Sequence, residues 1–99
     1  MKILFVCEAV KWFDKVNGNT YHSVRVTRTE DGAVIVGQYQ YGYGDQYRHT
    51  ALEEMIGAGW IPERYKQEPY MYERENGYPI QWILRQGTKR ECKANGVIP

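Results

Sequence analysis

Three stretches near the start of the chain combine apolar residues with the length of a β-strand. Residues 3–10 form an apolar run that predicts a core strand, and residues 21–28 and 33–41 are rich in β-branched and aromatic side chains. Asn17-Gly18 separates the first two stretches and residues 30–32 separate the second from the third. Both connections contain residues that tolerate positive φ, as hairpin turns require. The pattern therefore predicts three strands joined by two hairpin turns.

The register of the second hairpin depends on the length of its loop. A two-residue loop at Asp31-Gly32 pairs Val26 with Gly37, whereas a three-residue loop at 30–32 pairs Val26 with Val36. The longer loop gathers four valines on one face, so the hydrophobic pattern favours it. These valines are Val24, Val26, Val34 and Val36. The other face then carries Tyr21, Ser23, Arg25, Thr27, Ile35, Gly37, Tyr39 and Tyr41.

One amphipathic helix is expected after the third strand. Either Asp45 or Thr50 begins it, since Thr50-Ala51-Leu52-Glu53 has the pattern of a capping box. Gly59 is expected to end the helix in the left-handed conformation. Its apolar stripe consists of Leu52, Met55 and Ile56.

The second half of the chain contains another apparent hairpin. Residues 69–74 and 78–85 have the character of strands, and Glu75-Asn76-Gly77 between them is typical of a turn. Residues 87–99 are expected to form a loosely held tail. The predicted order is β-β-β-α-β-β in one domain over residues 1–86. This order defines an α+β fold in which a single helix covers one face of a mainly antiparallel sheet.

Composition narrows the possible functions only in part. The 99 residues carry a net charge of +1, which gives neither the basic footprint of a duplex-binding protein nor the charge of an acidic DNA mimic. A local basic cluster near the C-terminus contains a single opposing charge, Glu91, and is interpreted as a solvated tail. Nine tyrosines suit either a half-buried sheet or a binding surface. The basic cluster near the C-terminus consists of Arg85, Lys89, Arg90 and Lys93.

The two cysteines give no sign of a metal site. Cys7 and Cys92 lie near opposite ends of the chain, and neither has a cysteine or histidine at ligand spacing. We therefore expect no zinc, no cofactor and no required disulfide. The apolar start is too short for a signal peptide because Glu8 interrupts it, so a cytoplasmic protein without a membrane partner is expected.

Catalysis is not indicated by any motif. The sequence contains no GxSxG, HExxH, paired-carboxylate or phosphate-loop pattern. A small hydrolase or nuclease assembled from distant residues is the remaining enzymatic alternative, and we expect a protein that is not an enzyme. The titratable candidates would be His22, His49, Asp14, Asp45 and Cys7.

Residues 39–50 are the most unusual stretch, because tyrosines alternate with glycines just before the helix. The glycines allow a close backbone approach, the tyrosines could stack on a base, and Arg48 could meet a phosphate. Asp45 would repel a phosphate. The alternative is a purely structural connection between strand and helix.

A partner protein could also use these aromatic side chains. The expected contact surface combines one face of the second hairpin with the glycine-containing segment, and Trp12 is a second anchor. In the alternative interpretation, the hairpin predicted over residues 69–85 covers this face with Trp82. The partner-binding candidates are Tyr21, Arg25, Tyr39, Tyr41, Tyr43, Tyr47, Arg48 and Trp12.

Residues 11–21, residues 41–47 and the helix at Thr50 resemble small bacteriophage-encoded accessory proteins. The resemblance covers about the first sixty residues and assigns no individual site residue. It implies a viral inhibitor that docks on a host or defence protein, for example an anti-CRISPR, in the host cytoplasm. The alternative is a protein that binds a nucleotide or single-stranded nucleic acid, including a sponge for a signalling nucleotide.

Overall fold

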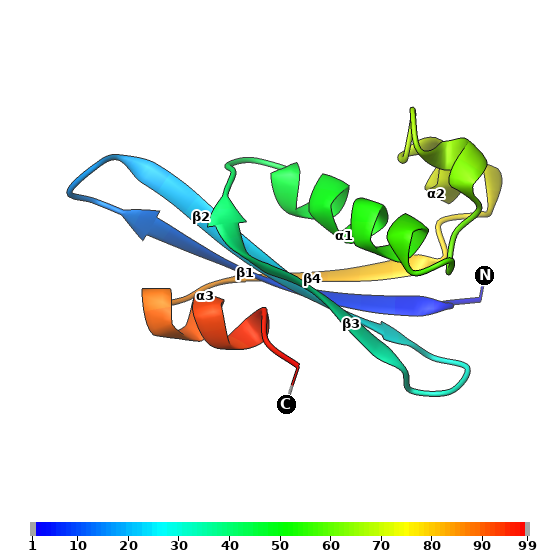
Figure 1. Ribbon diagram of the computed structural model, residues 1–99, viewed down its shortest axis with the longest axis horizontal. Helices are drawn as coiled ribbons and strands as arrows, with labels where there is room; N and C mark the ends of the chain where they lie inside the picture. The colour runs from blue at the N-terminus through cyan, green and yellow to red at the C-terminus, as the bar shows by residue number, and fades with distance from the viewer. Residues whose placement is uncertain (1, 99) are drawn as a thin grey trace.

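The computed structural model describes residues 2–98 and shows an α+β fold with a four-stranded sheet between helices (Figure 1). This confirms the predicted class. The elements in chain order are β1 (Phe5–Asp14), β2 (Asn19–Arg28), β3 (Val34–Tyr41), α1 (Gln46–Gly57), the 3-10 helix η1 (Glu63–Tyr65), α2 (Met71–Glu75), β4 (Ile80–Gln86) and α3 (Lys89–Asn95).

The sheet is mixed, with strand order β3-β2-β1-β4. The hairpins β1–β2 and β2–β3 are antiparallel, but β4 pairs with β1 in parallel. The predicted strand at 69–74 is wrong, since α2 occupies residues 71–75. Gly77 has φ +72° and the N–H of Tyr78 bonds to the carbonyl of Glu73, so this segment ends a helix instead of turning a hairpin. Both structures need positive φ, and Asn-Gly supplies it for either.

The favoured register of the β2–β3 hairpin is also wrong, by one residue. Val26 pairs with Ile35 and Arg25 with Val36, so Val34 and Val36 lie on the face opposite Val24 and Val26. The loop is one residue longer than predicted because the N–H of Arg28 bonds to the carbonyl of Ala33. Arg28 at the end of β2 forms an ion pair with Asp31 of the loop, with 2.7 Å between Nη2 and Oδ2.

A β-bulge restores the predicted register toward the far end of the same hairpin. The register shifts between His22 and Val24, where one residue of β2 opposes two residues of β3. Beyond the bulge, Tyr21 pairs with Tyr41. The bulge therefore allows Tyr39 and Tyr41 to share the face of Tyr21, as predicted.

Helix α1 covers one face of the sheet and builds the main core. Its buried side chains Ala51, Leu52 and Met55 are fully enclosed against strand residues that include Val24 and Val26. Asp45 precedes the helix and Thr50 lies inside it, so the first of the two predicted starts is correct. Gly59 has φ +77°, which confirms the left-handed residue after the helix.

Helix α3 covers part of the opposite face (Figure 1). The predictions of a loose tail and of a single covering helix are therefore wrong. Thr88 and Glu91 form a complete capping box, Cys92 is fully buried, and the hydroxyl of Ser23 on β2 donates to the Cys92 carbonyl. Asn95 donates to the carbonyl of Glu8 on β1. These polar contacts attach the helix to two strands.

Both cysteines are free and buried. Cys7 belongs to the core under α1, whereas the Cys92 thiol donates to the carbonyl of Val10. Burial raises the pKa of the Cys7 thiol to about 12, so it stays protonated and unreactive. Residues 2–98 hold no group of three or more potential metal ligands and no helix long and apolar enough to cross a membrane.

Candidate functional site

Three of the predicted contact residues form a stack across β1, β2 and β3. Trp12 lies opposite Tyr21, with ring centroids 5.7 Å apart, and Tyr21 stacks on Tyr39 with centroids 5.0 Å apart. Such cross-strand aromatic pairs stabilise a sheet because the alternating side chains of neighbouring strands meet on one face. We call Trp12, Tyr21 and Tyr39 the aromatic ladder.

Lysines of α3 lie over both ends of the aromatic ladder. Lys89 Nζ is 5.5 Å from the Trp12 ring and Lys93 Nζ is 5.3 Å from the Tyr39 ring. The two lysines are four residues apart and so share one side of the helix. The ring faces are therefore occupied by other rings or by ammonium groups, and the ladder serves first to hold α3 on the sheet.

The tyrosines that follow the ladder are far more exposed. Tyr41 contacts Tyr21 edge-on at 5.9 Å, and Tyr43 contacts Tyr41 edge-on at 6.5 Å. Tyr41 is 57% exposed and Tyr43 is 70% exposed. These two side chains extend the aromatic surface to the segment between β3 and α1. We call residues 41–45 the tyrosine turn.

Hydrogen bonds from three directions hold the tyrosine turn. The N–H of Gly42 donates to the carbonyl of Thr20, Lys11 Nζ donates to the carbonyl of Gly44, and His22 Nδ1 lies 3.1 Å from the carbonyl of Gly42. A Cβ on Gly42 would lie 2.6 Å from His22 Cε1, so only glycine fits at this position. The exposed tyrosines are thus presented on a fixed backbone.

His22 is fully buried beneath the turn and links it to α1. Because a carbonyl only accepts, Nδ1 carries the proton toward Gly42, and Nε2 accepts from the Thr50 hydroxyl at 2.8 Å. Desolvation lowers the pKa of His22, nearby Lys11 lowers it further, and the bond to Gly42 opposes the shift. The imidazole is accordingly neutral in the folded protein.

This arrangement predicts that acid weakens the fold through His22. The unfolded chain takes up the proton at about pH 6.5, before the folded chain does, so the free energy of unfolding should decrease below that pH. The contribution is complete above pH 6.5 and is lost as the pH falls toward the lower folded-state pKa. Urea denaturation at about pH 7.5 and about pH 5.5 measures the change.

His22→Gln is the matched comparison, since it removes the titrating ring while His49 and all carboxylates remain. Its unfolding free energy should depend less on pH than that of the natural protein in this interval. Equal pH dependence in the two proteins would contradict the assignment.

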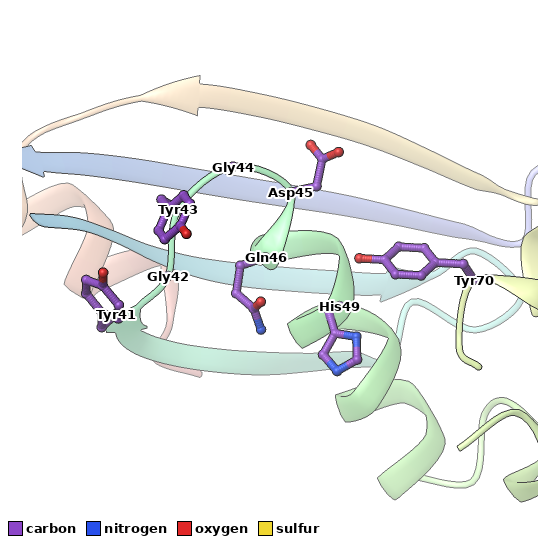
Figure 2. Close-up of a pocket in the computed structure, with 8 residues that line it drawn as sticks. All are labelled: Tyr41, Gly42, Tyr43, Gly44, Asp45, Gln46, His49 and Tyr70. Carbon is purple, nitrogen blue, oxygen red and sulfur yellow. The ribbon is translucent and has the colours of Figure 1, made fainter. Parts of the chain in front are cut away.

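A shallow hollow of about 690 Å³ opens beside the tyrosine turn (Figure 2). Tyr70, which precedes α2, closes it from the side opposite Tyr41, and its hydroxyl points toward the middle (Figure 2). Within α1, His49 Nε2 lies 2.6 Å from Oε1 of Glu53. We call this the tyrosine hollow; its lining residues are Tyr41, Gly42, Tyr43, Gly44, Asp45, Gln46, His49 and Tyr70.

Two predicted contact residues lie elsewhere. Tyr47 is buried edge-on against Trp82, and the Arg48 guanidinium lies 5.0 Å from the Trp82 ring, so both face β4. The predicted continuation of the surface through Tyr47 and Arg48 is therefore wrong, as is the alternative in which Trp82 covers the aromatic face. Arg25 does share the face of α3, where it donates to the carbonyl of Val97 at 2.6 Å.

Tyr70 was not among the residues predicted from the sequence. It lies 25 residues beyond Asp45 in a segment that the sequence assigned to a strand, and no local pattern connects it to the tyrosine turn. The lysines over the ladder belong to the basic cluster that the sequence predicts to be a solvated tail. In their case Thr88 and Glu91 offered a usable signal, since they form a capping box.

The five titratable candidates are dispersed over the fold. Asp14 accepts hydrogen bonds within the β1–β2 turn, which lowers its pKa, and Cys7 and His22 are buried at separate positions. Asp45 and His49 both line the tyrosine hollow. Among residues 2–98, these are the two candidates that line one hollow.

No protein-family model matches the chain. Searches of curated proteins and of solved structures found no match either. The function of the protein has to be inferred from its own side chains.

Proposed function

We propose that this protein is a non-enzymatic binding protein that docks on another protein through the tyrosine turn. The carrying observation is that Tyr41 and Tyr43 are 57% and 70% exposed on a backbone held by Thr20, His22 and Lys11. Tyrosine is among the side chains that dominate the energy of protein interfaces.

The fixed turn lowers the cost of binding. Tyrosine has few rotatable bonds, and a backbone that is already ordered loses little conformational entropy on association. The edge-on contacts between Tyr21, Tyr41 and Tyr43 restrict the rings further. A partner would therefore meet a preformed aromatic surface, and less of the burial energy would be spent on ordering the turn.

Nucleotide or single-strand binding has weaker support at this surface. Stacking of bases needs free ring faces, and those of the aromatic ladder are taken by neighbouring rings and by Lys89 and Lys93, which leaves only the exposed rings of Tyr41 and Tyr43. The carboxylate of Asp45 in the tyrosine hollow would repel a phosphate. These observations favour a protein partner.

The proposed biological role is inhibition of a host or defence protein by a viral accessory protein, with anti-CRISPR activity as one example. Its support is the resemblance of residues 11–21 and 41–47 to bacteriophage accessory proteins. The second of these segments contains the tyrosine turn and the first contains Trp12 and Tyr21. The role implies action in the host cytoplasm.

The test is the affinity of the Tyr41→Ala/Tyr43→Ala variant for a partner captured by the natural protein from bacterial lysate. Loss of two exposed aromatic anchors should weaken binding by about tenfold or more, about 1.4 kcal/mol, with little change in melting temperature. Isothermal titration calorimetry measures the affinity. Tyr78→Ala is the matched control, because Tyr78 is 56% exposed outside the turn.

Equal affinities of the double variant and the natural protein would contradict docking through the tyrosine turn. The salt dependence gives a second criterion. A captured nucleic acid would lose affinity steeply as salt increases, whereas aromatic docking on a protein would change little. A steep salt dependence would therefore favour the nucleic-acid alternative.

A further inference from the structure

We infer that the tyrosine hollow accepts a cationic side chain, preferably the guanidinium of an arginine, from the docked partner. This inference rests on the proposed function and adds the chemistry of the partner's contact. It follows from the charges, the aromatic rim and the free carboxylate of the hollow.

The charge of the hollow favours a cation. Asp45 and His49 are its only lining residues besides the tyrosines that can ionise, and His49 is engaged with Glu53. Asp45 occupies the N-cap position of α1, yet its side chain makes no capping hydrogen bond. Aspartate at this position usually bonds to the first turn of the helix. The carboxylate points away from Gln46 and His49 (Figure 2), so a ligand would reach it at the edge of the hollow.

The surroundings extend the same charge. Two further hollows adjoin through His49, which lines all three. Together the three hollows are lined by four carboxylates and two permanently charged cations, so the lining itself carries net negative charge. The carboxylates belong to Asp45, Glu53, Glu63 and Glu68, and the cations are Lys66 and Arg74. Two cations outside the lining lie near Asp45. Lys11 donates to the carbonyl of Gly44, and the pKa of Arg48 is raised by its hydrogen bond to Tyr47 and also by the charge of Asp45.

The aromatic rim suits the same ligand. Tyr41, Tyr43 and Tyr70 border the hollow, and none of the three has a cation over its ring among residues 2–98. This contrasts with Trp12 and Tyr39, whose rings already hold lysines of α3. Exposed tyrosine rings attract a cation through their quadrupole, and their hydroxyl oxygens accept hydrogen bonds.

Guanidinium matches the hollow better than ammonium does. Its planar group stacks on aromatic rings and can donate two parallel hydrogen bonds to one carboxylate, here Asp45. It also carries less bound water than an ammonium group. A volume of about 690 Å³ leaves ample room for one such side chain.

The test is an NMR titration of the full chain with N-acetyl-arginine amide, using N-acetyl-citrulline amide as the neutral probe of the same shape. We expect saturable shifts of the backbone amides of Tyr43, Gly44 and Asp45 with arginine. Citrulline should bind about fivefold more weakly or worse, which corresponds to about 1 kcal/mol.

Asp45→Asn should reduce arginine binding to the citrulline level. Glu30→Gln is the matched control, since it removes an exposed carboxylate in the distant β2–β3 loop. Equal binding of the two probes, no saturable shift with arginine, or full arginine binding by Asp45→Asn would each overturn the inference.

The result is separable from the proposed function. Should arginine fail to bind while Tyr41→Ala/Tyr43→Ala still loses its partner, protein docking stands and the cationic contact is wrong. Should arginine bind while Tyr41→Ala/Tyr43→Ala keeps full affinity for the partner, the hollow binds a cation but docking through the tyrosine turn is wrong.

Discussion

Val26→Asp should unfold the protein, whereas Val36→Asp should leave it folded. Val26 is 0% exposed under α1, so the substitution places an unpaired charge in the core. Burying such a charge costs several kcal/mol, about as much as the whole stability of a small domain. Val36 lies on the other face and pairs with Arg25, so the new carboxylate would meet a cation. We expect a loss of about 1 kcal/mol there.

Thermal unfolding followed by circular dichroism distinguishes the two variants. The comparison is sharp because both positions are valines in paired strands of one hairpin. The register predicted from the sequence places both valines in the core and so requires both variants to unfold. Unfolding of Val36→Asp, or a stable Val26→Asp protein, would contradict the register described above.

The second large effect is expected at Gly37 of β3, which Thr50 of α1 and Val24 of β2 approach closely. A Cβ at this position would be 2.7 Å from Thr50 Cγ2 and 2.7 Å from Val24 Cγ2. Real side chains do not approach so closely, so Gly37→Ala would force α1 away from β3. Overpacking of this kind costs about 1–3 kcal/mol. Urea denaturation measures the loss.

Thr50→Ser provides the control for Gly37→Ala. Serine removes one of the two methyl groups that the new Cβ would meet, leaving that of Val24, and keeps the hydroxyl that donates to His22. The Gly37→Ala/Thr50→Ser protein should therefore be more stable than the sum of the two single changes allows. Additive losses would show that contact between Gly37 and α1 is not the cause.

The parts of the fold that could be predicted are those with local signals. The first three strands follow from runs of apolar and β-branched residues, and Gly18 and Gly59 adopt the positive φ that their positions predict. Residues 71–77 show the limit of such signals. Asn76-Gly77 is compatible with a hairpin turn and with the end of a helix. The sequence around it does not show that β4 pairs with β1 in parallel, and this pairing decides between the two structures.

Distant contacts decided the remaining features. The hydrophobic pattern of β3 fits either face because Val34, Ile35 and Val36 are consecutive. The observed register places Gly37 opposite Val24 and under Thr50 of α1, where a Cβ would lie 2.7 Å from each of those two side chains. The candidate site likewise combines residues that a local pattern predicts with residues that it does not. Strand alternation placed Tyr21, Tyr39 and Tyr41 together, but it could not bring in Tyr70 or the lysines of α3 from far along the chain.

The parallel pairing of β4 with β1 also has a consequence for synthesis on the ribosome. β1 ends at Asp14, and its second neighbour begins only at Ile80. At about 5–20 residues per second, roughly 3–13 s pass before that neighbour exists. The β1–β2–β3 meander and α1 are synthesised within this interval, and until it ends one side of β1 has unpaired N–H and C=O groups. A nascent chain is thus open to strand addition by other chains at an edge that the finished protein hides in the middle of its sheet.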